Sequence, residues 1–205
     1  MTGELHQKSD WISIGEAVSD VVENMRTVDI DLLNEFLCYD QETGHLTWKH
    51  RDTKHFPSYA YSLTWNKKNA HKPALNCINH YGYRHGAILG RNFLAHRVIY
   101  AMHYGKWPNK QIDHINGIRT DNRIKNLREV TGSENLKNQK ISVKNKSGVT
   151  GVCRHGNTDK WVAFIKVNRR KRHLGLFSRF EDAVKARKQA EKELGFHENH
   201  GRKPA

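Results

Sequence analysis

The sequence predicts an α+β protein: a central unit of two strands and one helix, a three-stranded antiparallel sheet packed on one helix, and a short helical extension at the N-terminus. Two patterns support this fold class. Apolar residues recur at helical spacing near both ends of the chain and once in its middle, and short strand-like runs bounded by turn residues lie between these segments. A hydrophobic content of 37% over 205 residues favours two or three modest folding units over one large core.

The N-terminal extension, residues 1–38, contains two expected helices. Residues 11–26 place apolar side chains at helical spacing with acids between them, and residues 29–37 form a second such segment. The apolar positions of the first segment are Trp11, Ile14, Val18, Val21, Val22 and Met25. We favour helices that pack on their own domain; the alternative is a helix that binds a partner or forms a homodimer.

The middle of the chain changes to shorter elements. Strands are expected at His45–Trp48 and Tyr81–Arg84, and residues 52–76 between them are polar, irregular and without an assigned role. Apolar side chains at helical spacing predict a helix over residues 94–104, and Gly105 follows where a helix would end.

The C-terminal part begins after a polar linker at residues 139–146. The expected strands are Val149–Arg154, Trp161–Val167 and Lys171–Leu176, and the expected helix runs from Phe180 to Leu194. Ser178 and Glu181 have the spacing of a capping box at its start, and Gly195 marks its end. On the second strand, alternation sends Trp161, Ala163 and Ile165 toward the helix and leaves Val162, Phe164 and Lys166 outward.

The net charge points to a polyanionic partner. The chain carries a formal charge of +14, and residues 1–42 hold ten of its 21 acids, so the basic surface must lie beyond residue 42. No run of 18 apolar residues and no basic-then-apolar leader are present, which argues against a membrane partner and favours a cytoplasmic protein. Three widely spaced cysteines indicate neither a disulfide framework nor a thiolate zinc site.

The segment from Gln111 to Asn138 concentrates short polar side chains in a window that cannot bury them all without a site or a bonded turn. Ile112 to His114 is expected to end a strand, Asn116 and Gly117 to make a tight turn, and residues 131–138 to form a short capped helix. The polar members of this window are Asp113, His114, Asn116, Asp121, Asn122, Asn126 and Asn135.

This pattern resembles the His-Asn-His, or ββα-metal, endonucleases that are common as phage homing enzymes. The resemblance covers D-H-I-N-G from Asp113 and continues to Asn135, with Ala95-His96-Arg97 and the run from Tyr39 to Trp48 upstream. It implies a phosphodiesterase that cuts double-stranded DNA with one Mg²⁺ or Mn²⁺ ion, encoded by a phage and acting in the bacterial cytoplasm. The final histidine of the family name is an asparagine here.

By motif position, Asp113 and Asn135 would hold the metal, His114 would be the general base, and Asn126 would fix the histidine ring or tie the loop together. Neighbouring strand residues point to opposite faces, so Asp113 and His114 share a site only if the strand breaks between them. Asn122 is interpreted as a turn-capping amide and His96 as structural. If Asp113 proved distant from Asn135 and the imidazole turned inward, only a nucleic-acid clamp would remain.

The C-terminal part resembles the ethylene-response-factor, or Apetala-type, DNA-binding domain, in its S-G-V-T-G-V, K-W-V-A-F-I and F-E-D-A-V-K-A runs. This implies a sheet laid in the major groove. Val162 and Phe164 stand where that family has polar side chains, which puts base-specific contacts in doubt. The expected DNA contacts are Arg97, Lys140, Lys144, Lys146, Arg154, Lys166, Arg169, Arg170, Lys171 and His173.

The expected domains are therefore the extension at 1–38, a nuclease domain at 39–138, the linker at 139–146, the DNA-binding domain at 147–196 and a tail at 197–205. A metal-dependent endonuclease is the favoured function. The alternatives are a non-catalytic DNA-binding regulator that keeps the nuclease fold, and an RNA-binding protein, which would be expected to expose more aromatic side chains than Phe164.

Overall fold

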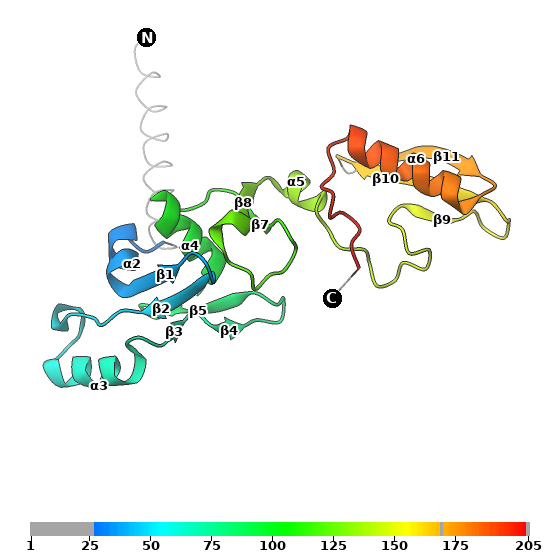
Figure 1. The fold of residues 1–205 in the computed structure, drawn as a ribbon. Helices are drawn as coiled ribbons and strands as arrows, with labels where there is room; N and C mark the ends of the chain where they lie inside the picture. Colours follow the sequence, from blue (N-terminus) through cyan, green and yellow to red (C-terminus); the bar gives the residue numbers. More distant parts are fainter. Residues whose placement is uncertain (1–26, 169, 204–205) are drawn as a thin grey trace, which may run out of the picture. The chain divides into compact units, whose positions relative to one another are not determined.

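The computed structural model describes residues 27–168 and 170–203 and has the α+β fold that the sequence predicts (Figure 1). The helix expected over residues 11–26 and the expected DNA contact Arg169 lie outside the described residues. The chain forms two compact units that are interleaved along the sequence. Of the described residues, unit 1 comprises 27–40, 45–77 and 85–107, and unit 2 comprises 41–44, 78–84, 108–168 and 170–203.

Unit 1 begins with helix α2 (Ile30–Phe36), which confirms the second expected helix. Its N-terminus is capped by the Asp29 carboxylate, which accepts hydrogen bonds from the backbone amides of the first turn. The helix leads directly into an antiparallel sheet of β1 (Leu37–Asp40), β2 (His45–Trp48) and β3 (Pro73–Ala74). Leu33 and Phe36 of α2 are fully buried, and α2 packs against helix α4 (Ala95–Tyr104).

The segment 52–76, expected to be irregular, contains the short η1 (Thr53–His55) and the helix α3 (Tyr59–Asn69). Periodicity missed α3 because the residues it buries, Ser62 and Asn66, are polar. The Asn66 amide exchanges two hydrogen bonds with the backbone of Arg51, and the Arg51 guanidinium lies over the rings of Phe36, Trp48 and Trp65. Buried in this way, Arg51 has a pKa lowered to about 10 by desolvation.

A second sheet has the strand order β4-β5-β6 and leads into α4. The strands are β4 (Cys77–Ile78), β5 (Arg84–Ile88) and β6 (Arg91–Leu94). The strand expected at Tyr81–Arg84 is wrong, because the Asn79 side chain accepts from the amides of Tyr81 and Tyr83 and closes a turn there. The prediction for α4 is confirmed, with Gly105 in the left-handed conformation at its end.

Unit 2 contains the expected two strands and a helix. Strand β7 (Gln111–His114) pairs antiparallel with β8 (Leu127–Val130), after the short η2 (Ile124–Asn126), and α5 (Gly132–Leu136) follows. Thr131 and Glu134 form the capping box that their spacing predicts. Gly117, at φ 70°, makes the turn after β7, where its amide bonds the carbonyl of His114.

The C-terminal module of unit 2, residues 147–196, is a three-stranded antiparallel sheet packed on a helix. Its elements are β9 (Val152–Arg154), β10 (Trp161–Val167), β11 (Arg170–Phe177) and α6 (Phe180–Glu193), with sheet order β11-β10-β9. Ala163 and Ile165 are buried, as alternation predicts. The capping box expected at Ser178 is absent, because Arg179 is the N-cap of α6 and makes no side-chain cap bond.

Candidate active site

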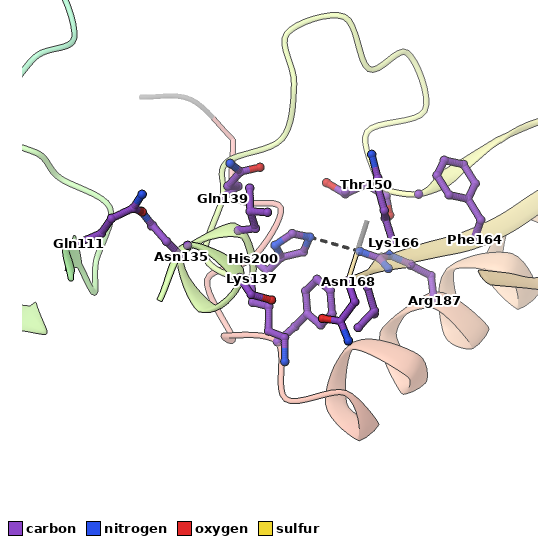
Figure 2. Close-up of a pocket in the computed structure, with 16 residues that line it drawn as sticks. Gln111, Asn135, Lys137, Gln139, Thr150, Phe164, Lys166, Asn168, Arg187 and His200 are labelled. Atoms are coloured by element: carbon purple, nitrogen blue, oxygen red, sulfur yellow. Dashed lines mark hydrogen bonds between the residues drawn. The ribbon is translucent and has the colours of Figure 1, made fainter. Parts of the chain in front are cut away.

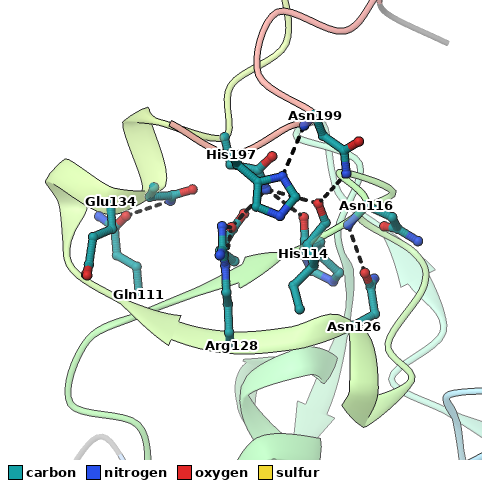
Figure 3. A network of polar contacts seen from close by, with 12 residues as sticks. Gln111, His114, Asn116, Asn126, Arg128, Glu134, His197 and Asn199 are labelled. Atoms are coloured by element: carbon teal, nitrogen blue, oxygen red, sulfur yellow. Dashed lines mark hydrogen bonds and ion pairs between the residues drawn. The ribbon is translucent and has the colours of Figure 1, made fainter. Parts of the chain in front are cut away.

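Asp113 and His114 are consecutive residues of strand β7. Asp113 pairs with Arg128 and His114 pairs with Leu127 in an unbroken register with β8, so β7 continues through His114. Their side chains therefore point to opposite faces of the hairpin. The break between Asp113 and His114 that a shared site would need is not present, and each side chain has its own set of partners (Figure 3).

The Asp113 carboxylate is held by one cation and one amide. Arg128 donates from Nε and Nη2 to Asp113 Oδ2 at 3.0 and 2.8 Å, across the strand pair. Asn138 Nδ2 lies 2.9 Å from the same oxygen and 3.2 Å from Oδ1, and also lies 3.2 Å from the carbonyl oxygens of His114 and Ile115. Asp113 is 8% exposed, so protein groups and not solvent set the orientation of its carboxylate.

Asn135 lies on the same side of the hairpin but binds a different residue. Its Nδ2 donates to Gln111 Oε1 at 2.8 Å. Gln111 and Asp113 are two positions apart on β7 and therefore share a face, so two neighbouring side-chain pairs form, Gln111 with Asn135 and Asp113 with Asn138. The predicted metal pair of Asp113 and Asn135 thus shares a face without sharing a hydrogen bond.

On the opposite face, the His114 ring is 3% exposed and its Nε2 lies 2.9 Å from Asn122 Oδ1. Burial lowers the pKa of His114 and outweighs the opposing effects of the Asn122 hydrogen bond and of Asp113. The ring is therefore neutral near pH 7. With Nε2 donating to the amide oxygen, the lone pair lies on Nδ1. The Tyr83 ring lies beside it, with centroids 5.8 Å apart.

The loop between β7 and β8 is tied by Asn126 and Asp121. Asn126 Oδ1 accepts from the Asn116 amide and its Nδ2 donates to the Asp121 carbonyl, at 2.9 and 2.8 Å. Of the two roles considered for Asn126, loop closure is the one whose contacts are present. The Asp121 carboxylate accepts from Arg123 and Asn116, which lowers its pKa to about 2.

Three residues near the hairpin have contacts that the sequence did not predict. Asn122 was expected to cap a turn, yet it is 1% exposed and binds the histidine ring. Asn138 was not singled out, although it is 2% exposed and holds Asp113. Arg119 is exposed, lies over the Tyr83 ring and donates to the Tyr81 carbonyl. Asparagine and arginine are common in loops, so composition alone gave no signal for any of them.

The Asp113 carboxylate faces two hydrogen-bond donors, Arg128 and Asn138 Nδ2. Among the described residues, no group of three or more histidine, cysteine or acidic side chains that could hold a metal ion converges. Asp113 Oδ1 accepts one hydrogen bond, at 3.2 Å, and retains acceptor capacity. Oxygen ligands of this kind fit Mg²⁺ or Mn²⁺ and not a softer metal.

The expected DNA contacts are mostly exposed. Lys140, Lys144 and Lys146 are exposed in a segment without helix or strand, and Arg97 is half-buried on α4 beside the buried His96. In the C-terminal module, Lys171 Nζ lies 4.0 Å above the Phe164 ring and Arg154 lies 4.5 Å above that of Trp161. Lys166, Arg170 and His173 are exposed on the same sheet.

A cavity of about 1040 Å³ lies within unit 2, beside these candidates (Figure 2). Gln111 and Asn135 line it from the hairpin and α5, and Phe164, Lys166 and Arg187 line it from the C-terminal module. The Arg187 guanidinium approaches His200 Nε2 to 3.2 Å and pairs with Glu191 at 3.1 Å, so its charge is compensated within the protein.

Comparison with known proteins finds a family match for one segment of the chain. Residues 93–137 match the family of HNH endonucleases, a range that includes α4, the β7–β8 hairpin and α5. Searches of curated proteins and of solved structures found no match. No helix in the described part of the chain is long and apolar enough to cross a membrane. The chain therefore contains an HNH endonuclease domain, and this family implies phosphodiester hydrolysis with DNA as the substrate.

Proposed function

We propose, from the HNH endonuclease domain at residues 93–137, that this protein is a divalent-metal-dependent endonuclease that hydrolyses phosphodiester bonds in double-stranded DNA. The observation that carries the proposal is that the matched segment coincides with the β7–turn–β8–α5 unit, in which Asp113 and a neutral His114 are consecutive residues that face opposite sides of β7. We further propose that it is of the phage homing type, as its motifs suggest.

In this proposal His114 is the general base. A base must be neutral before it accepts a proton, and the lowered pKa of His114 satisfies that requirement at pH 7. Asn122 accepts from Nε2 and so holds the ring, which makes Nδ1 its basic nitrogen. Asn126 contributes by closing the loop that carries Asn122.

Asp113 and Asn135 are proposed as the ligands of the metal, from the face of the hairpin that they share. Bound there, Mg²⁺ or Mn²⁺ supplies Lewis acidity that offsets the negative charge growing on the phosphate oxygens. Arg128 and Asn138 hold the Asp113 carboxylate in place. Gln111 does the same for the Asn135 amide.

The C-terminal module is proposed to bind DNA as an Apetala-type domain. Lys166, Arg170, Lys171 and His173 are exposed on one sheet, and few acids lie near them in the sequence to compensate their charge. With the linker lysines, this cluster is suited to phosphate contacts. A homodimer through the N-terminal helix is also proposed, since two copies would be needed to cut both strands with one site each.

A second candidate is a non-catalytic DNA-binding protein. Two observations favour it: the His114 imidazole is 3% exposed, and the Asp113 carboxylate is already paired with Arg128. Under this alternative DNA binding is retained and strand cleavage is absent. Binding affinity alone does not separate the two candidates, because both predict salt-sensitive association.

The decisive experiment is nicking of supercoiled plasmid with Mg²⁺ or Mn²⁺, repeated with chelator. The proposal expects metal-dependent nicking that is lost in His114→Ala and retained in Lys171→Gln at saturating protein. His103→Ala, on the exposed end of α4, is a matched control for a lost imidazole. Cleavage by His114→Ala at the parent rate would remove the catalytic assignment of His114, whereas DNA binding without any nicking by the parent protein would leave the DNA-binding candidate.

A further inference from the structure

The chain after α6 returns to the HNH hairpin. Residues 196–203, the C-terminal segment, make backbone hydrogen bonds with the stretch that follows α5. The His197 amide donates to the Lys137 carbonyl, the Gly201 amide donates to the Gln139 carbonyl, and the Arg202 carbonyl accepts from the Ile141 amide, at 2.8 to 3.1 Å. A segment expected to be a plain tail is thus paired along the residues that carry Asn138.

Two side chains of this segment reach the site itself: Asn199, which is labelled in Figure 3, and Arg202. Asn199 Nδ2 donates to the Ile115 carbonyl at 3.1 Å, directly after β7. Arg202 Nη1 donates to the carbonyl and the side-chain oxygen of Asn138, at 2.7 and 2.9 Å. A guanidinium has donors and no acceptor. It can therefore form a hydrogen bond only with the oxygen of the Asn138 amide and not with the nitrogen.

This contact determines which end of Asn138 faces Asp113. An asparagine amide can turn by half a rotation and exchange its oxygen and nitrogen. With the oxygen held by Arg202, Nδ2 is directed at both carboxylate oxygens of Asp113 and at the carbonyls of His114 and Ile115. The opposite orientation would bring the amide oxygen against the Asp113 carboxylate and those two carbonyls, which is repulsive.

The hairpin turn is shaped to admit Arg202. A Cβ atom added to Gly117 would overlap the Arg202 guanidinium, so the glycine that makes the turn after β7 also leaves the space for this side chain. Burial lowers the pKa of Arg202, and the charge of Asp113 opposes that effect.

We infer that Arg202 is a positioning residue of the nuclease site, which orients the Asn138 amide and through it the Asp113 carboxylate. The inference rests on the proposed function of Asp113. It has a second consequence: because the C-terminal segment continues from α6, the alignment of the site depends on a folded C-terminal module.

The test uses the full-length protein and compares Arg202→Ala, Asn138→Ala and their double variant, with Lys203→Ala as the control for an exposed neighbouring charge. We expect Arg202→Ala to lower the single-turnover nicking rate by roughly tenfold, the equivalent of about 1.4 kcal/mol. Its dissociation constant for DNA, measured in chelator, should stay within about twofold of the parent, since Arg202 acts through Asn138 and not on the substrate.

The double variant should be no slower than the slower single variant, because both substitutions break one chain of contacts. Arg202→Lys keeps the charge without the planar fork and should recover part of the rate. Multiplying effects in the double variant, parent-like nicking by Arg202→Ala, or a loss confined to DNA binding would each overturn the inference. Should Arg202→Ala fail to fold, Arg202→Lys and Asn138→Ala carry the comparison.

A readout that needs no cleavage separates this inference from the proposed function. The side-chain amide signals of Asn138 in a ¹H–¹⁵N NMR spectrum should shift in Arg202→Ala and stay in place in Lys203→Ala. If His114→Ala cuts like the parent while the Asn138 signals still move, the catalytic assignment fails and the positioning contact stands. Unmoved signals in Arg202→Ala would overturn the contact itself, whatever the protein cleaves.

Discussion

Arg128 donates two hydrogen bonds to a single oxygen of Asp113, at 3.0 and 2.8 Å, and the two residues occupy paired positions on β7 and β8. The pair is unequal in exposure: the Arg128 side chain is 35% exposed and that of Asp113 9%. A cation bound by Asp113, as proposed, would approach a carboxylate whose charge is already partly compensated, so Arg128 would both orient Asp113 and compete with that cation.

Replacing Arg128 by Gln should therefore lower the Mg²⁺ concentration needed for half-maximal nicking. Unit charges about 4 Å apart interact by about 1 kcal/mol in water and about 4 kcal/mol near a protein surface, so we expect a shift of roughly tenfold. A Mg²⁺ titration of the nicking rate measures it. Arg179→Gln removes an equal charge from an exposed pair at the start of α6. Equal shifts in both variants would show a general charge effect and contradict direct competition.

Asn122 should set the pH range of activity through His114. Burial lowers the pKa of His114 from its usual 6.5, so the neutral base persists into mildly acidic solution and the rate falls only below that range. In Asn122→Asp a carboxylate would accept from Nε2 and favour the charged ring. The acidic limb of the pH–rate profile should then move up by about one unit. Asn92→Asp, exposed on β6, controls for the added charge, and an unmoved limb would rule out the Asn122 contact.

Asn126 should matter for stability more than its small side chain suggests. Asn126→Ala removes two hydrogen bonds and leaves the Asn116 amide and the Asp121 carbonyl without these partners. We expect a loss of roughly 1 to 3 kcal/mol in the free energy of unfolding of this unit, measured by urea denaturation. Asn92→Ala, at an exposed position, should stay within about 0.5 kcal/mol. A similar small loss for Asn126→Ala would mean that the loop is closed by other contacts.

Lys171 should contribute to DNA affinity without reading sequence. In Lys171→Gln the dissociation constant should rise equally for unrelated duplexes, and the slope of log K against log salt should become less steep by about 0.9. Fluorescence anisotropy at several salt concentrations measures both. Lys192→Gln, on helix α6, is the matched control. An unchanged slope for Lys171→Gln would argue that this sheet does not face the phosphates.

Elements could be predicted from the sequence where the spacing of nearby residues determines them. The helix α4 with Gly105 at its end, the capping box of Thr131 and Glu134, and the buried Ala163 and Ile165 of β10 all follow from spacing alone. Helix α3 was missed because its buried residues, Ser62 and Asn66, are polar, and the partner of Asn66, the Arg51 backbone, is 15 positions away. A long-range partner leaves no trace in the local pattern.

In the candidate site too, local features could be predicted and long-range contacts could not. That Asp113 and His114 belong to a strand next to a glycine turn could be predicted, and so could the helix that carries Asn135. Which asparagine binds which group could not. The amides of Asn122, Asn126, Asn135 and Asn138 have the same chemistry, and only the fold of the loop and the return of the C-terminal segment assign them to different partners.

The interleaving of the two compact units constrains how such a gene could recombine. The turn between β1 and β2, with Gly44 packed on the backbone of Asn122 and Arg123, belongs to the second unit, although the strands on both sides of it belong to the first. A single crossover anywhere between residues 41 and 107 would join pieces of both units from different parents. Viable chimaeras should therefore exchange at the start of the C-terminal module, where a crossover divides the second unit and leaves the first from one parent, provided that the incoming segment still has a residue able to fill the space beside Gly117.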